Sequence, residues 1–133
     1  MTRGAAAIKL GQASEIVLGD LSAVRDWSDA RDVVRVAWLA LQAPEPDEYV
    51  IASGVGRTVG DLVRTALDAA GVTGPASAHV RVDPAFVRPP EPTLLVGDPS
   101  RAREQLGWQQ QVSFEQMIGE MVDADLAELS AGT

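Results

Sequence analysis

The chain has 133 residues, 46% of them hydrophobic and 23% charged, a composition typical of one globular domain. Its formal net charge of −8 argues against a nucleic-acid-binding surface, so an anionic ligand would bind only where arginines reverse the local field. The absence of cysteine excludes disulfides and thiolate metal sites, and no apolar run is long enough for a secretion signal or a membrane span, so we expect a cytoplasmic protein that binds no membrane.

The first forty residues predict two helices and a short strand. The opening segment to Leu10 suits a short helix, and residues 15–18 suit a strand. A loop then carries the motif Arg25-Asp26-Trp27 to Ser28, a good N-cap for a helix that extends to Gln42. Five apolar residues of this helix recur at helical spacing, namely Ala30, Val34, Ala37, Trp38 and Leu41.

The middle of the chain predicts a strand, a helix and another strand. Residues 49–52 are a plausible strand. Thr58 and Asp61 are three residues apart and resemble a capping box, which predicts a helix from this point to Gly71. Residues 80–82 are the next strand candidate.

The last third combines a proline-rich stretch with two helices. Prolines make residues 84–92 extended rather than helical, and residues 94–96 suit one more short strand. Asp98-Pro99 is typical of a helix start, and Gly107 ends that short helix. Ser113 opens the final helix. The predicted inner face of this helix consists of Phe114, Met117, Ile118, Met121, Val122, Leu126 and Leu129.

These elements amount to about four helices and three or four short strands. Such a mixture predicts an α/β or α+β-like fold with little sheet, formed by a single domain over residues 1–133. Because the strands are few, some of them could pair with a part of a larger molecule. The single histidine, His79, has no neighbours that would complete a metal site, so we expect no metal.

Two arginine-centred motifs and several shorter stretches carry a family resemblance. These stretches are Leu18-Gly19-Asp20-Leu21, Arg25-Asp26-Trp27, residues 47–52, Val82-Asp83-Pro84, Arg88-Pro89-Pro90-Glu91, Gly97-Asp98-Pro99-Ser100, Leu106-Gly107-Trp108 and residues 120–126. In this order they resemble the C-terminal half of a GDP-mannose 4,6-dehydratase, an extended short-chain dehydrogenase/reductase of the NAD-dependent epimerase/dehydratase class. The resemblance implies the substrate-binding lobe of that fold, with the dinucleotide-binding Rossmann half absent.

The resemblance also implies which residues bind the nucleotide sugar. Arg25 and Arg88 would clamp the diphosphate from two sides, because planar guanidinium groups bind its oxygens in a bidentate manner. Glu91 would accept hydrogen bonds from ribose hydroxyls, and the backbone at Gly19 and Asp20 would lie near the base. Asp26 is expected to orient Arg25 or to cap the helix that follows, rather than to touch the ligand.

The family's reaction needs NADP and a Tyr-x-x-x-Lys pair, and this sequence matches neither requirement. The only tyrosine, Tyr49, has Ser53 four residues later. Gly54-Val55-Gly56 is the only candidate for a glycine-rich phosphate loop, but Val59 replaces its last glycine, which favours a tight turn. We therefore expect no catalytic and no cofactor-binding residue in this chain.

The predicted function is that of a GDP-mannose 4,6-dehydratase-like domain, from a family of lyases, that binds GDP-mannose or a related nucleotide sugar and is not catalytic alone. Two alternatives remain open at this stage. The chain could be a stand-alone binding or regulatory module, or it could be one subunit of a split dehydratase. The split enzyme would require a separate cofactor-binding polypeptide, and an exposed apolar face would favour such a partner or self-association.

Overall fold

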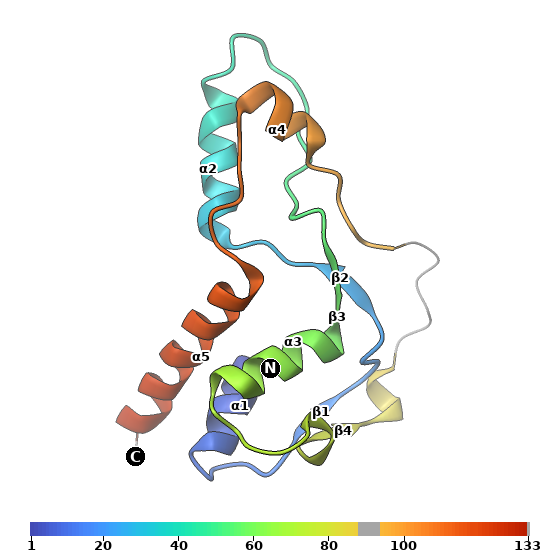
Figure 1. Ribbon diagram of the computed structural model, residues 1–133, viewed down its shortest axis with the longest axis vertical. Coiled ribbons are helices and arrows are strands. Elements are labelled where there is room, and N and C mark those ends of the chain that lie inside the picture. Colours follow the sequence, from blue (N-terminus) through green and yellow to red (C-terminus); the bar gives the residue numbers. More distant parts are fainter. Residues whose placement is uncertain (88–93, 133) are drawn as a thin grey trace. The chain divides into compact units, whose positions relative to one another are not determined.

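The structure, a computed structural model, describes residues 1–87 and 94–132 (Figure 1). Contacts group these residues into two compact units. The first unit contains residues 1–23, 58–87 and 115–132, and the second contains residues 24–57 and 94–114. The fold is a mixture of helices and short strands, which confirms the predicted class. The expectation of one domain over the whole chain stays a prediction.

Two packed helices form the centre of the first unit. The helices are α1 (Thr2–Lys9) and α3 (Val59–Ala69), which lie side by side in Figure 1. Ala5 and Ala6 of α1 are fully buried, as is Ala66 of α3. Small side chains at these positions let the two helices approach closely. Burial of this apolar surface provides the main stabilisation of the unit, since apolar area contributes about 25 cal/mol per Å² removed from water.

Two predicted strands that are far apart in the sequence pair with one another in the first unit. They are β1 (Ile16–Leu18) and β4 (Val80–Val82), which run parallel with Ile16 opposite Val80 and Leu18 opposite Val82. The ladder continues beyond β4, where the Asp83 N–H donates to the Leu18 carbonyl at 2.8 Å. Both strand predictions are therefore confirmed.

The helix that begins after Thr58 is capped as the sequence predicts. The Thr58 side chain accepts a hydrogen bond from the Asp61 N–H at 2.9 Å, and the Asp61 carboxylate accepts one from the Thr58 N–H at 2.9 Å. This reciprocal arrangement satisfies two of the backbone donors that a helix start leaves without partners. Gly71, just past the end of α3, has a φ of +66°, a backbone conformation that glycine adopts without steric cost.

The second unit is built around one tryptophan. Its elements are β2 (Val24–Asp26), α2 (Ala30–Leu41), β3 (Gly56–Thr58), whose last residue belongs to the first unit, and α4 (Ser100–Leu106). Val36 of α2, Ala102 of α4 and Trp108 form the buried cluster, and Leu39, Tyr49, Ile51 and Leu106 pack against it. Figure 1 shows α2 and α4 side by side. Gly107 ends α4 with a φ of +63°, as predicted.

Several local predictions in this unit are wrong. The Arg25 motif lies on strand β2, which pairs with β3, and not in a loop. Residues 49–52 form no strand, and residues 94–96 contribute only an isolated bridge between Leu95 and Arg25. Strand formation depends on a partner ladder more than on the intrinsic preference of the residues, which explains both errors.

Helix starts and the proline-rich stretch also differ from expectation. The N-cap of α2 is Asp29 and not Ser28: its carboxylate accepts from the Arg31 N–H at 2.8 Å. Pro99, rather than Asp98, is the N-cap of α4. The start of the proline-rich stretch is a 3-10 turn, Pro84–Phe86, where extended chain was expected.

The predicted apolar face is partly confirmed in the last helix and is exposed in α2. In α5 (Phe114–Ala131), Phe114, Ile118 and Val122 are buried as predicted, whereas Met121 is 49% exposed. In α2 the face that carries the five recurring apolar residues is exposed, and the buried positions are Asp32 and Val36. A stripe of this kind ordinarily faces a core. Among the described residues, no helix is long and apolar enough to cross a membrane.

Candidate functional site

In the first unit, the predicted base-binding backbone packs against the chain that leads to Arg88. Gly19 follows β1, and a side chain there would collide with the Phe86 carbonyl oxygen and lie 3.2 Å from the Val87 nitrogen. The parallel ladder of β1 and β4 produces this close approach, since it places the end of β1 beside the residues that follow β4. Gly19 is therefore required here by backbone proximity.

Asp20 shapes the turn after Gly19. Its carboxylate accepts hydrogen bonds from the Ser22 N–H at 2.8 Å and from the Ser22 hydroxyl at 2.6 Å. A carboxylate that caps its own turn in this way fixes the backbone locally. The turn continues into α3 through the Gly60 N–H, which donates to the Leu21 carbonyl at 2.9 Å. Two further predicted residues, Arg88 and Glu91, lie outside the described residues, and their roles stay predictions.

In the second unit, Arg25 lies in the middle of β2. The strand pairs with β3, and Arg25 itself forms a parallel bridge with Leu95. Its guanidinium donates to the Val24 carbonyl at 2.7 Å. The backbone of Arg25 is thus bordered by two other stretches of the chain, which restricts the directions that its half-buried side chain can take.

Asp26 binds three backbone N–H groups from two separate loops. Its carboxylate accepts from Ser53 at 2.8 Å, from Gly54 at 3.0 Å and from Gly97 at 3.3 Å. Burial opposes ionisation of Asp26, but hydrogen bonds from Ser53, Gly54 and Gly97 outweigh that effect and lower its pKa below the usual 3.8. Of the two roles expected for Asp26, the cap on α2 is wrong, because Asp29 caps that helix. The orientation of Arg25 by Asp26 stays a prediction.

Glycines allow the loops to approach β2 and each other. A side chain at Gly56 would lie 2.8 Å from both Val24 and Val96, and one at Gly97 would collide with Ala52. Gly54 has a φ of +81° and turns the chain so that its N–H meets Asp26. Gly54-Val55-Gly56 is therefore a turn and a tightly packed strand start. The N–H of Gly54 donates to a carboxylate of the protein itself.

Two arginines, on α4 and β3, lie over aromatic rings of the same unit. Arg103 donates to the Ser53 carbonyl at 2.9 Å, and its guanidinium lies 5.8 Å from the centre of the Trp108 ring. Arg57 lies 4.4 Å from the centre of the Phe114 ring, against which Trp27 also packs. Cation–π contacts of this type contribute about 0.5–2 kcal/mol each, depending on solvent exposure.

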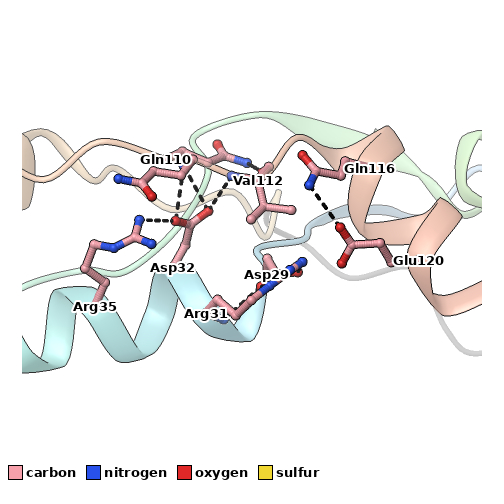
Figure 2. Close-up of polar contacts among 9 residues, drawn as sticks. Asp29, Arg31, Asp32, Arg35, Gln110, Val112, Gln116 and Glu120 are labelled. Carbon is pink, nitrogen blue, oxygen red and sulfur yellow. Dashed lines mark hydrogen bonds and ion pairs between the residues drawn. The ribbon is translucent and has the colours of Figure 1, made fainter. Parts of the chain in front are cut away.

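A buried aspartate that the sequence analysis did not single out holds the end of the second unit (Figure 2). Asp32 is fully buried, and its carboxylate accepts from the Gln111 N–H at 3.1 Å and from the Val112 N–H at 3.0 Å. Arg35, one helical turn later, donates to the same carboxylate at 2.9 Å. The only signal in the sequence was an acidic residue in the first turn of a predicted helix, which most often serves the helix dipole.

These contacts hold the backbone of strand β2, which carries Arg25, against the neighbouring loops. Within the part of the chain that the structure describes, no group of three or more His, Asp or Glu side chains could hold a metal ion. The carboxylates of Asp26 and Asp32 are both occupied by backbone N–H groups.

Comparisons with known proteins agree on one family. The family model for GDP-mannose 4,6 dehydratase matches residues 1–121. A GDP-mannose 4,6-dehydratase from Yersinia enterocolitica is 36% identical over an alignment 153 residues long. The alignment covers 96% of this chain and 41% of the relative. GDP-mannose 4,6 dehydratase 2 from Arabidopsis thaliana is 40% identical over 126 residues, which cover 95% of this chain and 33% of the relative.

A solved structure supports the same fold. The structure of RMD from Pseudomonas aeruginosa complexed with NADPH is similar to this chain with a TM-score of 0.84 and 22% sequence identity. That match covers 96% of this chain and 41% of the other. The chain thus spans well under half the length of the proteins that it matches.

The close approach at Gly19 predicts that a single added methyl group destabilises the first unit. Gly19→Ala should lower the free energy of unfolding by about 1–3 kcal/mol, because backbone must move to make room. Gly119→Ala is the matched control: nothing lies within 4 Å of its added carbon, so this helical site should gain up to about 1 kcal/mol. Urea unfolding measures both values. Equal stability of Gly19→Ala and the unmodified protein would contradict the contact.

The hydrogen bonds to Asp26 predict a pH-dependent loss of stability in Asp26→Asn. The folded-state pKa is lowered, so the stabilisation is fully present above the ordinary value of 3.8 and disappears as the pH falls through the folded value. At neutral pH the variant should be less stable by about 1.5–3 kcal/mol, and the difference should shrink in acid.

The control for Asp26 is Asp47→Asn. Asp47 forms an exposed ion pair with Arg101, and such pairs contribute at most about 1 kcal/mol. Chemical denaturation at several pH values separates the two cases. A constant difference between the unmodified protein and Asp26→Asn across that pH range would contradict the assignment.

Proposed function

The chain belongs to the GDP-mannose 4,6-dehydratase family, and from this premise we propose that it binds a nucleotide diphospho-sugar such as GDP-mannose. Arg25 and Arg88 bind the diphosphate, and Glu91 accepts hydrogen bonds from the ribose. The backbone at Gly19 and Asp20 lies beside the base. The chain corresponds to the C-terminal portion of the family's proteins and supplies substrate binding without the chemical step.

The observation that carries this proposal is that the strand of Arg25 is held in place by neighbouring loops. Its strand is tied to the loops at Ser53 and Gly97 through the adjacent Asp26, which binds their N–H groups. A guanidinium on a braced strand loses less freedom on binding than one on a mobile loop, and preorganisation of this kind raises affinity. Its fixed positive charge also suits a diphosphate on a protein with a net charge of −8.

The backbone contact at Gly19 supports the other half of the proposal. Because Gly19 touches the backbone at Phe86 and Val87, the turn proposed to lie beside the base is joined to the residues that precede Arg88. Base-side and phosphate-side groups of the ligand are covalently linked, so the protein groups that bind them need to be held at a constant spacing. In the sequence, Arg88 follows directly after the residues that Gly19 contacts.

The proposal assigns hydride transfer to a different polypeptide segment. A dehydratase of this family uses NADP, and the RMD structure that resembles this chain was solved with NADPH. In this chain Gly54 and Gly56 serve the packing of β2 and β3, and Tyr49 packs against the Val36–Ala102–Trp108 cluster.

Replacement of Arg25 should weaken ligand binding in a manner specific to the diphosphate. Arg25→Gln should bind GDP and GDP-mannose roughly ten- to a hundredfold more weakly, since a charge-assisted hydrogen bond contributes about 1.5–3 kcal/mol. The loss should disappear for guanosine, which carries no phosphate, and Arg25→Lys should recover part of it. Isothermal titration calorimetry measures all three ligands.

The matched control for Arg25 is Arg101→Gln. This variant removes the same charge from the same unit. In the unmodified protein, the Arg101 guanidinium pairs with Asp47 at 2.9 Å on the surface. The affinity of the variant for GDP-mannose should stay within about twofold, because exposed pairs contribute little. Equal losses in the Arg25 and Arg101 variants would show a general charge effect and would contradict the clamp.

The chain alone should not convert GDP-mannose. Incubation with GDP-mannose and NADP should yield no 4-keto-6-deoxy sugar, because the chain lacks a Tyr-x-x-x-Lys pair. Chromatography of the nucleotide sugars measures the product, with a full-length relative as the positive control. Product formation by this chain alone would contradict the assignment of the chemistry to another segment.

A further inference from the structure

A second arginine lies beside Arg25 in the same pair of strands. Arg57 is the middle residue of β3, as Arg25 is the middle residue of β2, and these two strands of three residues each pair with one another. The two arginines are therefore neighbours across the ladder, where the Cβ atoms of facing residues are about 4.5–5.5 Å apart. Both arginines belong to the second unit.

The side chains of Arg25 and Arg57 project from the same face of this strand pair. A side chain at Gly56 would lie 2.8 Å from Val24, so positions 24 and 56 share one face. Side chains alternate between the two faces along a strand. Arg25 and Arg57, each one residue later, therefore share the other face.

Aromatic contacts agree with this placement. The Arg57 guanidinium lies 4.4 Å from the centre of the Phe114 ring, and the Trp27 ring packs against the same phenylalanine at 5.9 Å between ring centroids. Trp27 is two residues after Arg25, so the alternation of β2 places it on the arginine face. A guanidinium has five N–H donors, and its attraction to a ring face uses none of them as a hydrogen-bond donor.

The acidic neighbour of Arg25 in the sequence lies on the opposite face. Asp26 follows Arg25 directly, and its carboxylate accepts hydrogen bonds from the N–H groups of Ser53, Gly54 and Gly97. This carboxylate is therefore directed to the loops and away from the arginine face. The two guanidinium groups remain like charges on neighbouring positions of the ladder.

Like charges that face one another across a strand pair destabilise it. A bound anion reverses this effect, because both guanidinium groups are then attracted to one ligand, and a diphosphate carries enough oxygens and charge for two of them. We propose that Arg57 is a further phosphate-binding residue, which binds the diphosphate together with Arg25. This inference rests on the proposed function for the role of Arg25, and it adds a residue that lies outside the family motifs.

The test is isothermal titration calorimetry of the full chain with inorganic pyrophosphate, without divalent cations. Pyrophosphate has the charge of the diphosphate but neither base nor sugar. Arg57→Gln should bind it roughly tenfold more weakly, because a charge-assisted hydrogen-bonding group is lost. Arg57→Lys should recover part of the affinity, since it keeps the charge without the planar fork.

The matched control is Arg101→Gln, which removes an arginine of the same unit that pairs with Asp47 on the surface. Its affinity for pyrophosphate should stay within about twofold of the unmodified chain. In NMR spectra, the Nε–H signal of Arg57 should shift on titration and saturate with the calorimetric dissociation constant, whereas the Arg101 signal should stay in place. A residue that only packs over Phe114 would show neither the weakened binding nor the shift.

The outcomes distinguish this inference from the nucleotide-sugar proposal. Pyrophosphate binding that depends on both Arg25 and Arg57 supports the inference, even where GDP-mannose binds no more tightly than pyrophosphate, a result that contradicts the proposed ligand alone. Unchanged pyrophosphate affinity in Arg57→Gln, or an Arg57 signal that does not shift at saturation, would overturn the inference and leave the Arg25 variants to test the clamp. A chain that binds no pyrophosphate would overturn it as well.

Discussion

The arrangement of the second unit depends on the hydrogen bonds that the Asp26 carboxylate accepts. The carboxylate accepts hydrogen bonds from the N–H groups of Ser53 and Gly54 in one loop and of Gly97 in another. These two loops are distant in the sequence. A partly buried backbone N–H group without a hydrogen-bond partner destabilises the fold. The single ionised side chain of Asp26 provides an acceptor for three such groups. The glycines at 54 and 97 permit the approach, and Arg103 holds the same loop from α4 through the Ser53 carbonyl.

This constraint explains why an arginine next to it is useful. Arg25 is the preceding residue on the same strand, so whatever fixes Asp26 also fixes the backbone of Arg25. In the proposed function, Arg25 binds the negatively charged diphosphate of the ligand. A strand that is held by neighbouring loops positions the arginine better than a loop would. The Asp32 contacts act in the same way on α2, where they determine which face of the helix is buried.

Sequence patterns predicted the elements whose stabilisation is local. The capping box of Thr58 and Asp61, the glycine end of α4 and the pair of strands at 16–18 and 80–82 all appear where expected. Patterns failed where distant contacts decide. Val50 and Ile51 favour a strand, but no ladder partner meets them among the described residues, whereas Val24 belongs to a strand because β3 lies beside it. The recurring apolar residues of α2 have helical periodicity, yet their face is exposed, because Asp32 and Val36 form the buried face.

For the candidate site, the family motifs identified Arg25 and Gly19, but the role of Asp26 required the loops to be placed in space. The central claim is that the guanidinium groups of Arg25 and Arg88 bind one diphosphate. The most direct measurement is a titration with GDP in which NMR follows the side-chain Nε–H signals of both arginines. The account predicts that both signals shift and saturate with the same dissociation constant. A signal of either arginine that stays unchanged while the ligand saturates the protein would contradict it.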